Sequence, residues 1–359
     1  MNILAIESSC DETAAAVVTK TDYGFQIKSN IVASQIETHR VFGGVVPEIA
    51  SRAHIEAISS ITYEALSEAK ISLSEIDLVA VTSNPGLIGA LLVGVNFAKA
   101  LALSNSIPLV AVDHIKGHIA AAYLLERPPV PPFIALTVSG GHTSIYKINS
   151  YSDIKVLGST RDDAIGESYD KIGRLIGIPY PAGRGFDALA KEGFVLATQD
   201  EENFYSKYKK SDSYKDPEMH LPSPAIPGDN LDFSFSGLKT AAINLLHKYE
   251  QKGEEINRAL FAARYTYEAT EAVAKKIALA LQNNPDCPLI LSGGVAANSH
   301  LRNRLTEVAK ELNTEIYIPP MSLCGDNGAM IAAAGYYEYA AGNLKDSSLN
   351  ASALDSLFE

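Results

Sequence analysis

The order of strands and helices expected from the sequence occurs twice along the chain, and this repetition limits the possible folds more than any single motif does. In each half, three consecutive strands are followed by helix, strand, helix, strand and helix, as judged from alternating and helical apolar spacing. Two such units that face each other form a cleft whose walls are the loops after the strands. The sequence therefore predicts an α/β protein of two lobes around a central cleft.

The elements of the first half follow from local patterns. The segment Glu48–Lys70 carries apolar residues at helical spacing, and the turn Asn84–Gly86 introduces a helix of small residues. Asp113 is predicted to cap the helix that follows the strand ending at Val112. The predicted strands are Asn2–Ser8, Thr13–Thr19, Phe25–Ser34, Leu78–Thr82 and Leu109–Val112, and the predicted helices are 48–70, about 89–104 and 115–126.

A proline-rich link, Arg127–Pro132, precedes the second half, and its stiffness suits a domain boundary. We place the first lobe at residues 1–127 with about 322–345, the second lobe at 128–321 and a C-terminal tail at 346–359. The predicted strands of the second half are Phe133–Ser139, His142–Ile148, Ile154–Thr160, Pro288–Leu291 and Glu315–Ile318, and two of its helices are Ala164–Ile176 and about Asn298–Leu312.

One polar segment, residues 192–230, interrupts the second lobe. It is rich in tyrosine and proline, which predicts a surface excursion rather than a core element. The segment is either a flexible loop or a contact for RNA or a partner protein, made through Lys207, Lys209, Lys210 and the tyrosines between them.

Composition narrows the class of protein. The 359 residues allow two domains with real cores, and 47% hydrophobic and 20% charged residues are typical of a soluble globular chain. Cys10, Cys287 and Cys324 form no C-x-x-C pair, which argues against a disulfide framework and favours a reducing compartment. Residues 1–9 carry no basic region, and no uncharged span reaches the ~18 residues that a membrane helix needs. We therefore expect a cytoplasmic protein without a membrane anchor.

The formal net charge of −12 argues against a sequence-independent nucleic-acid binder, whose affinity rests on the neutralisation of phosphates. This charge leaves room for a local basic path.

The stretch LVAVDHIKGH ends an apolar strand in two histidines, His114 and His118. On the predicted helix they lie on one face, roughly 6 Å apart, as two ligands of one metal ion would. Asp326, in LCGDNGAM at the start of another predicted helix, supplies a carboxylate that the helix dipole keeps ionised. The alternative is a helix-capping His114 and a packed His118. A set of two histidines and one aspartate with open positions fits a catalytic metal better than a structural one.

The repeated element order resembles that of the actin, hexokinase and Hsp70 ATPase superfamily. In that superfamily the hairpin turns of both lobes bind nucleotide phosphates. The matching turns here are Ser8–Thr13 and Ser139–Thr143, with Ser292–Asn298 on the adenosine side.

Eight motifs together resemble the universal tRNA threonylcarbamoyladenosine transferase family, whose members were once described as glycoproteases. They occur in register from about residue 3 to residue 335, which makes chance similarity very improbable. The motifs are IESSCDET, FGGVVPEIASRAH, NPGLIGALLVG, DHIKGH, VSGGHTS, FSFSGLKT, LSGGVAAN and CGDNGAM.

The resemblance implies transfer of a threonylcarbamoyl group from threonylcarbamoyl-AMP to N6 of the adenosine beside the anticodon, position 37, in tRNAs that read ANN codons, with release of AMP. It also implies one divalent iron or zinc ion on His114, His118 and Asp326, and, for a bacterial member, a smaller paralogue of the same fold and a P-loop ATPase as partners. The family's substrate-contacting positions match Thr137, Val138, Ser139, Gly140, Gly141, Asp170, Gly183, Asp187 and Asn298.

The chemistry of these residues agrees with such roles. Gly140 and Gly141 let backbone N–H groups approach an anionic oxygen without a Cβ in the way, although an ordinary hairpin turn would use them too. Asp170 and Asp187 can accept hydrogen bonds from ribose hydroxyls, or they are caps or parts of a solvated helix face. Asn298 offers both donor and acceptor, and it is also placed to cap a helix.

The sequence departs from the family pattern at three positions. Asp113 replaces the first histidine of the usual HHxxGH, and Lys116 replaces an acid, so the groups that orient the metal ligands can differ here. Arg184 stands where many members have a small or apolar residue, which affects the expected contacts of Gly183 and Asp187.

The acceptor amine must lose a proton as the new bond forms, which requires a base. Asp11, in the first lobe's hairpin turn, is our candidate, and the alternative is that it only shapes the turn. Lys239 in SFSGLKT either faces a phosphate or extends along the surface.

Three other functions compete. A metallopeptidase of the H-E-x-x-H type needs a glutamate where Ile115 stands. A kinase or ATPase of the same fold would hold Mg²⁺ with carboxylates, whereas two imidazoles prefer a softer ion. A non-catalytic assembly component would use a contact surface, for which residues 37–54 are a candidate, and the equal alternative is that this stretch lines the cleft or packs inside the lobe.

Overall fold

The structure is a computed structural model that describes all residues except 225, 227 and 359. Its contacts divide the chain into two compact units. Unit 1 comprises Met1–Ala135, Lys147–Lys155 and Tyr317–Glu359, and unit 2 comprises Leu136–Tyr146 and Val156–Ile316.

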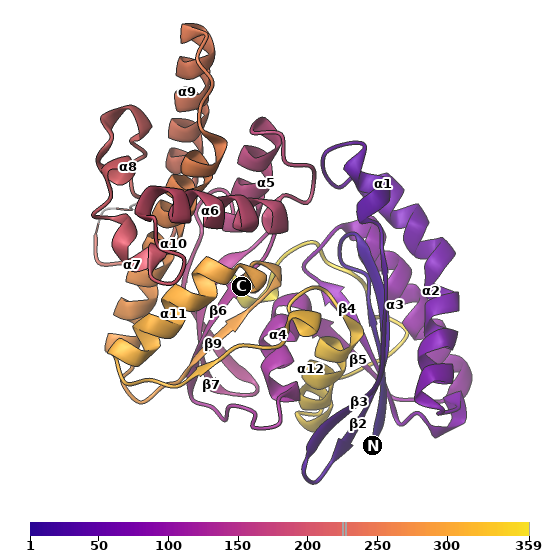
Figure 1. Cartoon of the computed structure of the whole chain (residues 1–359). Coiled ribbons are helices and arrows are strands. Elements are labelled where there is room, and N and C mark those ends of the chain that lie inside the picture. Colours follow the sequence, from indigo (N-terminus) through magenta and orange to yellow (C-terminus); the bar gives the residue numbers. More distant parts are fainter. Residues whose placement is uncertain (225, 227, 359) are drawn as a thin grey trace. The chain divides into compact units, whose positions relative to one another are not determined.

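Unit 1 is built on a six-stranded mixed sheet of order β11-β5-β4-β1-β2-β3 (Figure 1). Strands β1, β4 and β5 are parallel, whereas β2 is antiparallel to both β1 and β3, and β11 is antiparallel to β5. Because parallel strands end at the same edge of a sheet, the last residues of β1, β4 and β5 gather there. The strands are β1 (Asn2–Glu7), β2 (Glu12–Thr21), β3 (Gly24–Ser34), β4 (Leu78–Asn84), β5 (Leu109–Asp113) and β11 (Leu344–Lys345).

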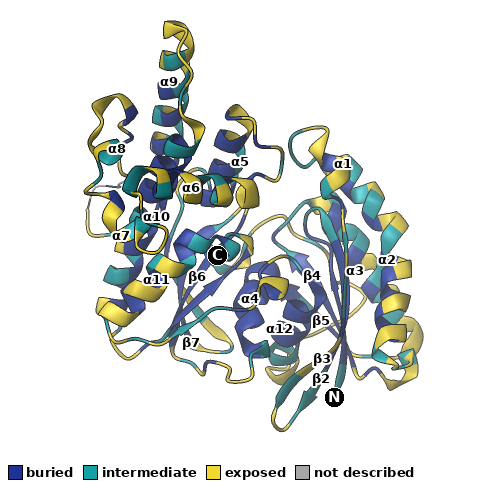
Figure 2. Ribbon diagram, in the orientation of Figure 1, coloured by how far each residue is buried: buried dark blue, intermediate teal, exposed yellow. Residues whose placement is uncertain are grey.

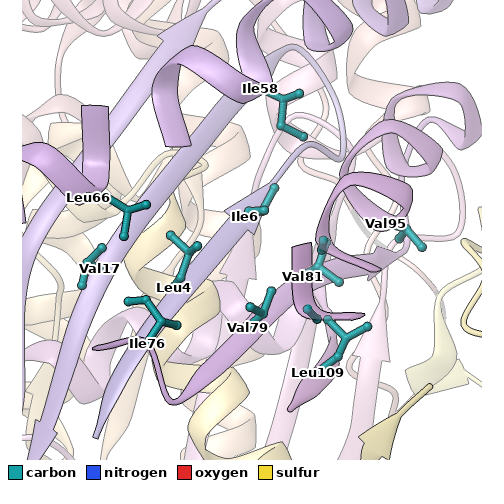
Figure 3. Packing of buried hydrophobic residues seen from close by; sticks show 12 residues of the cluster. Leu4, Ile6, Val17, Ile58, Leu66, Ile76, Val79, Val81, Val95 and Leu109 are labelled. Carbon is teal, nitrogen blue, oxygen red and sulfur yellow. The ribbon is translucent and has the colours of Figure 1, made fainter. Parts of the chain in front are cut away.

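Two long helices, α2 (Pro47–Ala69) and α3 (Ile88–Asn105), pack on this sheet and on each other. The strands contribute branched side chains to the shared core, and the helices contribute Ile58, Leu66 and Val95 (Figure 3). Each such residue, when fully buried, stabilises the fold by about 1.5–3 kcal/mol. The labelled strand residues of this core are Leu4, Ile6, Val17, Val79, Val81 and Leu109.

Helices α4 (His114–Ala120) and α12 (Gly328–Ala340) also belong to unit 1, and α12 contacts strands β1 to β5. Glycines allow α12 to lie unusually close to the sheet. A Cβ at Gly328 would be 2.6 Å from the backbone nitrogen of Ala16, and one at Gly335 would be 2.5 Å from Cβ of Ala80. The start of α12 is therefore fixed at short range to β2, two residues after Asp326.

Unit 2 contains most of a five-stranded sheet of order β10-β9-β6-β7-β8. Helix α10 is the centre of its helical layer, since it is buried over much of its length and contacts α6, α9 and α11 (Figure 2). The strands are β6 (Phe133–Val138), β7 (Thr143–Ser150), β8 (Asp153–Ser159), β9 (Leu289–Ser292) and β10 (Ile316–Tyr317), and the main helices are α5 (Ile165–Leu175), α6 (Gly183–Thr198), α9 (Ser236–Lys252), α10 (Arg258–Gln282) and α11 (Ser299–Glu311).

The helix expected at 115–126 is shorter than predicted. Helix α4 ends at Ala120, and a 3-10 turn, Ala121–Leu124, completes it. Tightening of a last turn is common, and Pro128 disfavours a helical conformation at the residue before it. A short helix α1 (Ile36–Arg40), not expected from the sequence, follows β3.

The segment 192–230 is more ordered than its composition suggests. Residues up to Thr198 belong to α6, and two short helices follow, α7 (Phe204–Tyr208) and α8 (Asp212–Lys215). Tyr208 is fully buried, with its ring edge against Phe194 at a centroid distance of 4.8 Å. Positions 225 and 227 of this segment lie outside the described residues.

Among the described residues, helix α3 alone is long and apolar enough to cross a membrane by length and composition. The core helix of a soluble protein meets the same criterion, so one such helix is weak evidence of a membrane span. About a third of α3 is buried inside unit 1.

Candidate functional site

The three predicted metal ligands come together in unit 1. Asp113 caps α4, because its Oδ1 accepts hydrogen bonds from the amides of Ile115 (2.9 Å) and Lys116 (3.3 Å). The helix therefore begins at His114, and the rings of His114 and His118 stand side by side with centroids 4.5 Å apart.

Asp326 faces both imidazoles. Its Oδ1 lies 3.3 Å from Nε2 of His118 and 3.5 Å from Nε2 of His114. One ligand atom from each of the three residues falls within 4.8 Å of the others. Two nitrogens and one oxygen in this arrangement suit a zinc or iron ion with open coordination positions.

The surroundings of His118 show whether these residues fit a metal ion. Its side chain is completely buried, and neither ring nitrogen has a hydrogen-bond partner among the described residues. A buried polar group without a partner costs free energy, so such groups call for a ligand. A cation beside Nε2 would satisfy that atom, and the residues present therefore fit a metal ion.

Glu7, which was not singled out from the sequence, orients the first ligand. It ends β1, is fully buried, and places Oε2 3.1 Å from Nδ1 of His114. A carboxylate on Nδ1 keeps that nitrogen protonated and leaves Nε2 free for a metal. The amide of Ser9 (2.5 Å) and the hydroxyl of Thr82 (2.5 Å) also donate to Glu7. The available signal was an acid, Glu7, directly after the apolar run Ile3–Ile6.

The carboxylates around the predicted metal ligands favour a bound cation. Burial lowers the pKa of His114, but the carboxylates of Asp326 and Glu7 outweigh it and raise that pKa to about 10. Burial and the nearby carboxylate of Asp326 raise the pKa of Asp11, and the same causes raise the pKa of Glu12 to about 8. Several carboxylates close together disfavour the charged form of one another, and a bound cation reverses that effect.

The second carboxylate oxygen of Asp113 makes contacts of its own. Its Oδ2 accepts hydrogen bonds from Nδ2 of Asn84 and from the hydroxyl of Ser356, each at 2.7 Å. The segment near Ser356 is thereby attached to the cap of the helix that carries the metal ligands. Burial, reinforced by the charge of Asp113, raises the pKa of the neighbouring Asp355 to about 6.

The predicted phosphate-binding turn lies in unit 2, directly after β6. The amide of Ser139 donates to the carbonyl of His142 (2.8 Å), which closes the turn. A Cβ added at Gly140 or Gly141 would meet no atom within 4 Å, so the backbone is open on that side. A Cβ at Gly166, the second residue of α5, would lie 2.5 Å from the Ser139 carbonyl oxygen, so the turn packs against the start of that helix.

Thr137 and Val138, also predicted as substrate contacts, are fully buried. The hydroxyl of Thr137 is 3.1 Å from that of Ser292, on the adjacent strand β9.

The remaining predicted substrate residues hold helix ends. Oδ1 of Asp170 accepts from the amide of Ala182 (2.7 Å), just before α6 begins at Gly183. Oδ1 of Asp187 accepts from the amide of Ser299 (3.0 Å), and Asn298 caps α11 by accepting from Leu301 (2.9 Å). Unit 2 thus brings Asp170 to Gly183, and Asp187 to Asn298.

Lys239 has its partner inside unit 2. Its ammonium group pairs with Asp163, which also contacts Lys171 at 3.3 Å. The lysine therefore stabilises the packing of α9 near the start of α5.

Comparison with known proteins identifies close relatives. A family model described as tRNA N6-adenosine threonylcarbamoyltransferase matches residues 26–333. A protein of that name from Clostridium botulinum (strain 657 / Type Ba4) is 46% identical over 351 residues, which cover 98% of this chain and 96% of the relative. One from Lactobacillus delbrueckii subsp. bulgaricus is 46% identical over 353 residues, which cover 98% and 94%.

Solved structures confirm the predicted fold. The chain is similar to full-length HypF in its phosphate- and nucleotide-bound form, with a TM-score of 0.56 and 14% identity, covering 93% of this chain and 45% of HypF. HypF from T. kodakarensis gives a TM-score of 0.52 at 15% identity, covering 97% of this chain and 49% of that one. The chain has the duplicated α/β fold of the actin, hexokinase and Hsp70 superfamily, and at such identities the likeness concerns the fold alone.

Proposed function

The chain belongs to the tRNA N6-adenosine threonylcarbamoyltransferase family, and from that premise we propose that its donor is threonylcarbamoyl-AMP, its acceptor is N6 of adenosine 37 in tRNAs that read ANN codons, and AMP is released. The enzyme is a tRNA-modifying transferase, as its relatives at 46% identity over nearly the full chain are. The observation that supports the finer assignment is the set of two buried histidines, His114 and His118, with the half-buried Asp326, which offers a metal site within such a chain.

His114, His118 and Asp326 would hold one Fe²⁺ or Zn²⁺ ion. Such an ion, when bound, supplies a Lewis acid that polarises an oxygen of the donor. The chain's own contribution is orientation, since Glu7 fixes the His114 ring and Asp113 fixes the first turn of α4.

Donor recognition is assigned to the residues of unit 2. The open backbone at Gly140 and Gly141 supports a role in receiving the phosphate, because N–H groups without neighbouring Cβ atoms form an anion-binding concavity. Asp170, Gly183, Asp187 and Asn298 surround the helix starts that would receive the nucleoside. Thr137, Val138 and Ser139 belong to the same set and act through the strand end that carries the turn.

Asp11 is assigned as the general base. An exocyclic adenine amine is a poor nucleophile, and it must lose a proton as its nitrogen bonds to the carbamoyl carbon. A carboxylate whose pKa is raised by burial accepts a proton more readily than an ordinary aspartate does, which supports this role.

Partners are expected to supply part of the tRNA surface. With a net charge of −12, the chain alone neutralises few phosphates, so its own affinity for tRNA should be weak and sensitive to salt. The partners that we propose are a smaller paralogue of the same fold and a P-loop ATPase.

The decisive experiment supplies chemically prepared threonylcarbamoyl-AMP, tRNA, the candidate partners and Fe²⁺ or Zn²⁺, and measures the nucleosides by mass spectrometry together with AMP. Modified adenosine at position 37 in an amount equal to the AMP formed supports the proposal. AMP without modified tRNA would mean that the donor is only hydrolysed, and it would contradict the proposal. A phosphorylated product in a parallel incubation with ATP and small metabolites would favour a kinase instead. A metallopeptidase is disfavoured by the fully buried Ile115, which stands where the catalytic glutamate would be.

A further inference from the structure

The turn between β1 and β2 carries Asp11, and three elements of unit 1 hold it through three consecutive backbone carbonyls. Two of the donors are backbone amides, which no substitution other than proline removes. The third donor is a side chain, so it can be deleted by mutation. The pairs are the Leu87 amide with Ser9 (2.8 Å), His54 Nε2 with Cys10 (3.0 Å) and the Gln35 amide with Asp11 (3.0 Å).

His54 lies on α2 and is completely buried. Its ring nitrogens contact the turn and the start of β2, since Nε2 is 3.0 Å from the Cys10 carbonyl and Nδ1 is 2.7 Å from the Thr13 hydroxyl. A carbonyl only accepts, so Nε2 carries the proton, and Nδ1 accepts from the hydroxyl of Thr13. Burial lowers the pKa of His54, which agrees with this neutral form.

The two contacts of His54 fall on either side of Asp11, one residue before it and two residues after it. The imidazole thus spans the segment that carries the carboxylate. A histidine that served packing alone would have no need to satisfy two polar groups of one turn, and the core residues next to it on the same helix face, such as Ile58, are apolar.

We propose that His54 is a positioning residue, which holds Cys10 and Thr13 and thereby sets the direction of the Asp11 carboxylate. We call the two contacts of His54, with Cys10 and with Thr13, the clamp. The effect of His54 on the reaction rate rests on the proposed function of Asp11, whereas the existence of the clamp does not. A catalytic group displaced by about 1 Å loses on the order of 10²-fold in rate. Ser9, which approaches the metal ligand His114, is held separately by Leu87, so the clamp acts on the base rather than on metal binding.

The test compares His54→Ala, His54→Gln and His54→Asn with a matched control, Ile58→Ala. Ile58 lies one helical turn further along α2, is almost fully buried and belongs to the apolar core that contains Ile6 and Val17 (Figure 3). The readouts are the single-turnover rate at saturating threonylcarbamoyl-AMP, the donor affinity, the metal content, and the deuterium uptake of the peptide that spans residues 8–13.

We expect His54→Ala to lower the single-turnover rate by roughly 10- to 100-fold, with donor affinity within about 3-fold and with metal retained. Deuterium uptake of the turn should increase. The glutamine amide reaches about as far as Nε2 and should recover most of the rate, whereas the asparagine amide reaches only as far as Nδ1 and should not. Ile58→Ala should lower the melting temperature without changing the rate or the uptake of the turn.

Equal rate and equal uptake in His54→Ala and the unmodified protein would overturn the inference, and so would an equal loss of rate in Ile58→Ala. If the unmodified protein transfers nothing, the proposed function fails, while the uptake data still decide whether the clamp exists. Should His54→Ala not melt cooperatively, Thr13→Val takes its place, because it removes one arm of the clamp without leaving a cavity.

Discussion

Glu7 and His114 are joined by a contact of 3.1 Å between Oε2 and Nδ1, although 107 residues separate them in the chain. The contact fixes which imidazole nitrogen faces Asp326. The parallel strands β1 and β5, which lie on either side of β4, make this pairing possible by ending at one edge of the sheet.

Glu7→Gln should therefore weaken metal binding. The glutamine amide is neutral and can turn either its oxygen or its NH2 group toward Nδ1. It therefore no longer enforces one tautomer of the His114 imidazole. We expect a loss of metal affinity of about 10- to 100-fold, measured by competition with a chromophoric chelator. Glu75→Gln, at an exposed carboxylate of the same unit, is the control. Unchanged affinity in Glu7→Gln would show that other contacts suffice to orient His114.

Replacing both metal-binding imidazoles, His114→Ala with His118→Ala, should abolish metal binding and transfer while the fold persists. Removal of His118 also removes two buried nitrogens that make no hydrogen bond among the described residues, although Nε2 faces Asp326, and this offsets part of the lost packing. The checks are elemental analysis, the transfer assay and circular dichroism. A double variant that kept both its metal and full activity would show that the ion is bound elsewhere.

Asp11→Asn should lower the single-turnover rate by ~10²-fold or more and leave donor affinity within a few-fold, because an amide cannot accept the proton. Rapid-quench measurement at saturating donor tests this directly. The exposed Asp22, at the tip of the same unit's hairpin, gives the control Asp22→Asn. If donor affinity fell in proportion and the rate at saturation did not change, Asp11 would be a binding residue instead.

Asp113→Ala should destabilise unit 1 by about 0.5–2 kcal/mol, the usual cost of losing a helix N-cap. The physical reason is that the amides of Ile115 and Lys116 lose their acceptor. Urea denaturation measures the free energy of unfolding. Ser356→Ala removes only a hydrogen bond to the other carboxylate oxygen and should cost less. Equal stability of Asp113→Ala and the unmodified protein would mean that water replaces the cap fully.

The parts of the site that depend on neighbouring residues could be predicted from the sequence. The strand before Asp113, the cap at Asp113 and the shared face of His114 and His118 are all set within ten residues, and each is present in the structure. The repeated element order was predictable for the same reason, since each strand and helix carries its own apolar pattern. The structure differs in the last turn of α4, in the additional helix α1 and in the short helices of the segment 192–230.

Contacts between distant segments could not be predicted. The sequence gives no reason to pair Glu7 with His114, or His54 with Cys10, because only the folded sheet and α2 bring them together. The segment 192–230 has a polar composition that suggested a surface excursion. Tyrosines of this segment contact residues far along the chain. For example, the Arg264 guanidinium carbon lies 4.0 Å from the centre of the Tyr214 ring. Asp170, Asp187 and Asn298 were selected for substrate contact, and the structure adds their roles at helix starts, which pattern alone offered only as an alternative.

The close approach of α12 to β2 makes the metal centre sensitive to side-chain volume at a position that has no ligand atom. Gly328 follows Asp326 by two residues, and a single methyl group there would occupy the space of the Ala16 backbone. The helix would have to move away from the sheet and would draw the carboxylate away from the two imidazoles. A random search for variants that lose metal binding should therefore recover Gly328 along with His114, His118 and Asp326, and no substitution at Ala16 should rescue a side chain at Gly328, because the clash is with backbone atoms.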